Sequence, residues 1–85
     1  MAQRRSRFTI ELVVETTDLT QERHEQQCRW LYRNMLSTNS DMRDTFYVAA
    51  VRDSDGRLIE FTGAGRGSPS NEIRKIIDDL TIETR

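Results

Sequence analysis

Three glycines alternate with other residues in the stretch FTGAGRGSPSNE, residues 61–72, where a β-rich segment gives way to a helical one. Backbone N–H groups in such a loop, beside a helix N-terminus, can bind a phosphate or a carboxylate. The G-x-G-x-G spacing matches neither the dinucleotide-binding fingerprint nor the P-loop. We therefore interpret the loop chiefly as a turn, with anion binding as the alternative. The candidate anion-binding residues are Gly63, Gly65, Arg66, Gly67, Arg4 and Arg5.

His24 and Cys28 lie four residues apart, a spacing that could supply one edge of a metal site on a helix. The chain has no other His or Cys, and Cys is among the residue types most often buried. We therefore expect both side chains in the core, and no bound metal or other cofactor. With no exposed His to act as a base, the sequence predicts a protein that is not an enzyme and takes no small-molecule substrate.

Trp30 is the residue that most clearly suggests a contact surface. At about 100° per residue it lies nearly opposite Cys28, on a helix face that carries arginines and side-chain amides. Trp and Arg are the residue types most enriched in the hot spots of protein interfaces. The alternative is that a tail or loop covers the ring in a small satellite core. The predicted protein-binding residues are Trp30, Arg23, Arg33, Asn34 and Gln26.

Hydrophobic periodicity predicts the elements that position these residues. Strands are expected at residues 8–14, 45–51 and 57–61, and the Asp55-Gly56 pair predicts a hairpin turn between the last two. The expected core residues are Ile10, Leu12, Cys28, Leu31, Met35, Val48, Phe61, Ile73, Ile76 and Ile77.

Capping residues predict where two helices begin. The first helix is expected from an N-cap at Asp18 or Thr20 to about Ser37, followed by the polar loop 37–41. The second is expected from an N-cap at Ser68, with Pro69 as its first residue, because proline suits that position.

The order β-α-β-β-α predicts an α+β fold, a two-layer sandwich of a three-stranded, mainly antiparallel sheet with both helices on one face. Because antiparallel neighbours are common in small sheets, we expect the strand at 57–61 to lie in the middle. Residues 1–85 are expected to form a single domain, with residues 1–6 as a flexible basic tail.

The charge balance and the cysteine count limit the classes of function that fit the chain. Thirteen basic and fourteen acidic residues give a net charge of −1, whereas general polyanion binders carry a basic excess. A single cysteine excludes an internal disulfide and favours a reducing compartment, and the sequence shows neither a membrane span nor a signal peptide. We expect a cytoplasmic protein-binding inhibitor or adaptor, of the kind encoded by phages or plasmids, that occludes a larger machine. The alternative is a nucleic-acid-binding module that uses Trp30 for stacking and arginines for phosphate contacts.

Overall fold

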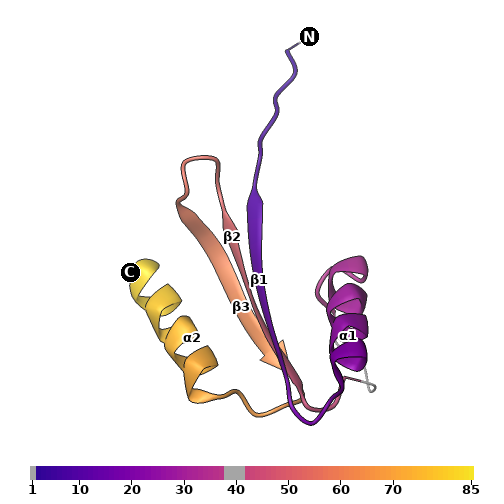
Figure 1. Cartoon of the computed structure of the whole chain (residues 1–85). Coiled ribbons are helices and arrows are strands. Elements are labelled where there is room, and N and C mark those ends of the chain that lie inside the picture. The colour runs from indigo at the N-terminus through magenta and orange to yellow at the C-terminus, as the bar shows by residue number, and fades with distance from the viewer. Residues whose placement is uncertain (1, 38–41) are drawn as a thin grey trace.

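The computed structural model describes residues 2–37 and 42–85 of the chain. It has the predicted α+β order of elements, with one sheet and two helices (Figure 1). The elements are β1 (Thr9–Thr16), α1 (Gln21–Arg33), β2 (Thr45–Arg52), β3 (Leu58–Gly65) and α2 (Asn71–Glu83). Residues 38–41, most of the predicted polar loop, lie outside the described residues.

The sheet has the strand order β1-β2-β3, and both pairs of neighbours are antiparallel. The prediction that the strand at 57–61 is central was wrong, because β2 occupies that place. Its sequence TFYVAAVR is apolar on both faces, and Tyr47, Val48, Ala49 and Ala50 are all buried. An uninterrupted apolar run is typical of a strand covered on both sides. That signal was present in the sequence.

The two helices cover opposite faces of the sheet, which corrects the prediction of a two-layer sandwich with both helices on one face (Figure 1). Successive side chains of a strand point to opposite faces. In β2, Tyr47 and Ala49 accordingly pack with Leu31 of α1. Val48 and Ala50 pack with Ile73 and Leu80 of α2, on the other side. The buried β2 strand therefore requires one helix on each face.

Helix α1 begins as predicted at Thr20, whose hydroxyl accepts a hydrogen bond from the Arg23 backbone N–H at 3.2 Å. The predicted apolar stripe of this helix runs through His24, Cys28, Leu31, Tyr32 and Met35. The buried face is instead centred on Gln27 and Leu31, about one-sixth of a turn away. The rotation leaves Tyr32 56% exposed, and Met35, which lies beyond the end of the helix, is 88% exposed. Assigning Met35 to the core was wrong, and so was assigning Ile10 of β1, which is 58% exposed.

Helix α2 begins two residues later than predicted, because Ser70 and not Ser68 is its N-cap. The Ser70 hydroxyl accepts a hydrogen bond from the Ile73 backbone N–H at 3.3 Å. Ile73 is buried as predicted, and the predicted core residues Ile76 and Ile77 pack against the same cluster, which also contains the buried Leu80.

Candidate protein-binding surface

The glycine loop is held in place by hydrogen bonds from its own backbone to the start of β2. The backbone N–H groups of Arg66 and Gly67 both donate to the Thr45 carbonyl oxygen, at 3.0 and 3.1 Å. Gly65 has a φ of +148°, and a Cβ there would lie 2.3 Å from the same carbonyl oxygen. Any larger residue would push the loop off the start of β2. The Arg66 and Gly67 N–H groups therefore already have an acceptor within the turn. Of this loop, the exposed Arg66 side chain is the group that could contact an anion.

A carboxylate of the protein itself lies at the N-terminus of α2. Glu15 of β1 accepts a hydrogen bond from the Ser70 backbone N–H at 2.9 Å, a favourable place for a negative charge. Arg5 and Asp53 line one hollow near the far end of the sheet, where Thr9 pairs with Arg52. The structure therefore does not bring the candidate anion-binding arginines of the N-terminal segment to the glycine loop.

Both ring nitrogens of His24 have protein partners. Nδ1 lies 2.8 Å from the Thr16 hydroxyl, and Nε2 lies 3.6 Å from the Cys28 sulfur. Partial burial raises the pKa of the Cys28 thiol, and the negative charge of Glu25 raises it further, which disfavours the reactive thiolate. Within residues 2–37 and 42–85, no three His, Cys, Asp or Glu side chains group to form a metal site.

Trp30 is half-buried, and it packs against the cluster of Leu31, Met42, Tyr47 and Ala49. The ring therefore contributes to the core as well as to the surface. The other predicted contact residues are exposed around it: Arg23, Gln26, Arg33 and Asn34. The structure brings these five residues together on one side of α1, and their role in binding stays a prediction.

An apolar groove that the sequence reasoning missed lies on the other side of α1, against β1. It has a volume of about 410 Å³, and its walls are Ile10, Leu12, Tyr32, Met35 and Leu36. Ile10 is 58% exposed and Met35 is 88% exposed. The sequence signalled apolar side chains here, but periodicity could not distinguish a core from an open groove.

The end of α1 holds the groove residues in an unusual conformation. Met35 and Leu36 have φ values of 55° and 64°, in the left-handed region that favours glycine. The Leu36 N–H donates to the Leu31 carbonyl at 2.7 Å, and the Leu36 carbonyl accepts a hydrogen bond from the Tyr47 hydroxyl. This turn anchors Leu36 to the core and leaves the Met35 side chain in solvent.

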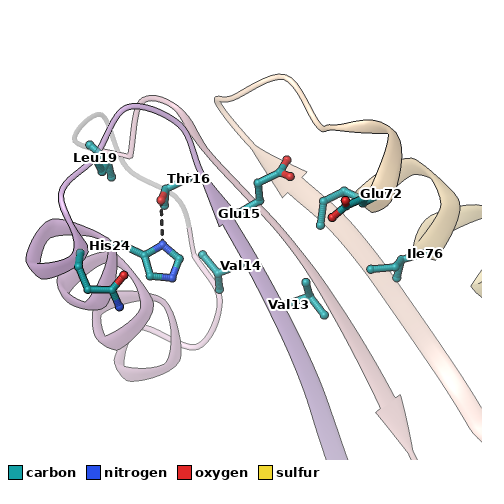
Figure 2. Close-up of a pocket in the computed structure, with 10 residues that line it drawn as sticks. Val13, Val14, Glu15, Thr16, Leu19, His24, Glu72 and Ile76 are labelled. Carbon is teal, nitrogen blue, oxygen red and sulfur yellow. Dashed lines mark hydrogen bonds between the residues drawn. The ribbon is translucent and has the colours of Figure 1, made fainter.

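A second hollow lies farther along the outer edge of β1, between the two helices (Figure 2). Val13 and Glu15 line it from the strand, His24 from α1, and Glu72 and Ile76 from α2. In the described part of the chain, no strand pairs with this edge of the sheet. The edge therefore offers backbone hydrogen-bonding groups, apolar side chains and two carboxylates along one line.

Arg52 ties the far end of the sheet to α2. Its guanidinium donates to Glu11 of β1 at 2.9 Å, and to both carboxylate oxygens of Glu83. The hydrogen bond from Arg52 lowers the pKa of Glu83, and the same contact raises the pKa of Arg52. This ion-pair network fixes the C-terminal end of α2 against the sheet.

Neither of the described helices is long and apolar enough to cross a membrane. Comparison with protein-family models, curated proteins and solved structures finds no match to this chain.

Proposed function

We propose that this chain is a non-enzymatic protein-binding domain that holds an extended, apolar and basic segment of a protein against the outer edge of β1. The observation that carries the proposal is the groove beside that edge, in which Ile10, Tyr32 and Met35 are each more than half exposed. Exposed apolar side chains are ordinary when they are scattered, but contiguous ones mark interaction sites.

The edge strand accounts for the extended shape of the bound segment. A peptide added beside β1 would hydrogen bond through its backbone and place alternate side chains toward α1 and toward α2. Side chains on the α1 side would meet Ile10 and Leu12, so apolar residues fit there. The strained turn at Met35 supports this role, because backbone strain is concentrated at functional sites.

The charge of the edge accounts for the basic character of the segment. Glu11 and Glu15 project from the α2 face of β1, and Glu72 lies beside Glu15 in the hollow shown in Figure 2. Glu11 is paired with Arg52, so an approaching arginine would find the Glu15 and Glu72 carboxylates as partners, and a nucleic-acid backbone would be repelled. An inhibitor or adaptor works by such contacts alone, without a catalytic group.

A matched pair of substitutions tests the proposal. Met35→Glu places a charge in the groove, whereas Ile82→Glu changes a similarly exposed residue, 65% exposed, near the end of α2. Immobilised wild-type protein and both variants are incubated with nuclease-treated host extract, and retained proteins are quantified by mass spectrometry. We expect one protein to bind the wild type and Ile82→Glu, and to be lost from Met35→Glu. Equal retention by all three, or retention that occurs only in a parallel extract without nuclease treatment, would contradict the proposal.

A further inference from the structure

We infer that the protein bound at the β1 edge is a second copy of this chain, paired antiparallel through β1 so that two sheets join into one. This inference rests on the proposed function, since it names the occupant of the same edge and groove. The segment that the edge requires is extended, apolar and basic. The chain carries such a segment in Arg4-Arg5-Ser6-Arg7-Phe8, immediately before β1, and Figure 1 shows it continuing the line of that strand away from the sheet.

The two edges of the sheet differ in how open they are to pairing. β1 is eight residues long, contains neither Pro nor Lys, and pairs with β2 without a bulge. β3 has an irregular register opposite Val51 and Arg52, and it contains Gly63 and Gly65. Bulges and charged residues are the usual protection of an exposed edge. On β1 the protection is limited to Glu11 and Glu15; Glu11 is already paired with Arg52, and an incoming arginine would neutralise Glu15.

One register satisfies the apolar and the charged residues together. With a two-fold axis perpendicular to the sheet at Ile10, this residue faces itself and Phe8 of each copy faces Leu12 of the other. Both pairs point toward α1, so Phe8 of the second copy enters the groove lined by Tyr32 and Met35. Phe8 is 56% exposed in the single chain, and this pairing would cover it.

On the opposite face the same register brings unlike charges together. Arg5 of each copy faces Glu15 of the other, beside the Glu72 carboxylate in the edge hollow. Arg7 faces Val13 and is flanked diagonally by Glu11 and Glu15, within reach of a long side chain. Each copy thus brings arginines to the Glu15 and Glu72 carboxylates of the other copy, while Glu11 keeps its contact with Arg52 of its own chain.

Neighbouring registers fit less well. An axis at Glu11 would place two carboxylates directly opposite each other, which is destabilising. An axis at Thr9 would oppose Ser6 to Leu12 and Arg4 to Val14, which packs against the core cluster of the α1 face. The Ile10 register is therefore the one to test.

Sedimentation equilibrium tests the inference with the whole chain, using two exposed isoleucines on opposite edge strands. Ile10 and Ile59 are 58% and 48% exposed. We expect the wild type and Ile59→Lys to be dimeric, and Ile10→Lys to dissociate at least about tenfold more readily, because two like charges would face each other. High salt should weaken the wild-type dimer, since the arginine–glutamate contacts are exposed. Circular dichroism verifies that each variant is folded.

A disulfide test remains informative if Ile10→Lys does not fold. In a Cys28→Ala background, Ile10→Cys should form an intermolecular disulfide readily, because facing Cα atoms in an antiparallel pair lie within bridging distance. Ile59→Cys and Thr9→Cys should not. A wild-type chain that is monomeric up to about 200 μM, well above the Kd of a specific dimer, would overturn the inference. So would a dimer that only Ile59→Cys cross-links.

The two proposals fail differently. If the chain is monomeric but still loses a protein partner on Met35→Glu substitution, the second-copy inference fails and the proposed function stands. If neither self-association nor partner retention responds to Met35→Glu, the proposed function itself fails.

Discussion

Replacing Met35 by glycine should stabilise the fold and weaken binding at the same time. Met35 has a φ of 55° and its side chain is 88% exposed, so the native conformation strains the backbone without burying apolar surface in the chain. A left-handed conformation costs a non-glycine residue about 1–2 kcal/mol. Glycine removes this cost but loses about 0.5–1 kcal/mol of free energy through its more flexible unfolded state. The net gain should be about 0.5–1 kcal/mol, the usual advantage of glycine after a helix C-cap.

Urea and thermal denaturation followed by circular dichroism measure this gain. For a domain of this size, it corresponds to an increase of about 2–8 °C in Tm. The comparison is best made in the Ile10→Lys background, so that self-association does not contribute to stability. Met35→Ala is the control, because it removes the same side chain and keeps the strained φ, and it should not raise Tm. A Met35→Gly variant less stable than Met35→Ala would refute the left-handed turn.

Three further predictions concern other parts of the molecule. Leu31→Ala should lower the free energy of unfolding by about 2–5 kcal/mol in urea denaturation, because Leu31 is fully buried; an unchanged midpoint would mean that α1 does not pack on the sheet. Arg66→Ala should change stability by less than about 0.5 kcal/mol, and a loss of salt-dependent binding would instead restore the anion-site hypothesis. Because Arg52 lowers the pKa of Glu83 from 4.5, the stability advantage of wild type over Glu83→Gln should be complete above pH 4.5 and disappear as the pH falls below it; an advantage that persists in acid would contradict the ion pair.

The sequence predicted the element types because local signals agree with the fold. The alternating and continuous apolar runs, the Asp55-Gly56 turn and the Thr20 cap each act within a few residues. The arrangement of the elements depends on both faces of β2, which only its uninterrupted apolar run signalled. The strand order was instead predicted from the frequency of antiparallel neighbours in small sheets, which gave the strand at 57–61 the central place, and both helices were assigned to one face.

The candidate surface was predicted less well, and α1 shows why. Periodicity placed Tyr32 and Met35 on the predicted apolar stripe because they are apolar, and it left out Gln27 because it is polar. In the structure Gln27 is buried, while Tyr32 and Met35 are exposed beside β1. A protein that binds others through apolar side chains has the same periodicity on a binding face as on a core face, so sequence alone cannot separate the two.

Substitution of Trp30 tests how α1 is rotated about its own axis, that is, which face of the helix packs on the sheet. The predicted phase leaves the indole on a polar face, where Trp30→Ala would affect binding far more than stability. In the structure the ring packs against the Tyr47 cluster. Trp30→Ala should therefore lower the free energy of unfolding by about 1–3 kcal/mol, less than the 3–5 kcal/mol typical of a fully buried aromatic. Trp30→Phe should recover part of that loss, and Arg33→Ala should change stability little.

Tryptophan fluorescence gives an independent measure of the same packing, because Trp30 is the only tryptophan in the chain. A half-buried ring should emit at an intermediate wavelength and be partly quenched by iodide. Full quenching, together with an unchanged unfolding midpoint for Trp30→Ala, would show that α1 is rotated back toward the predicted phase. In that case Met35 and Tyr32 would turn toward the sheet, the groove beside β1 would close, and the face with Arg23 and Arg33 would become the binding surface to test.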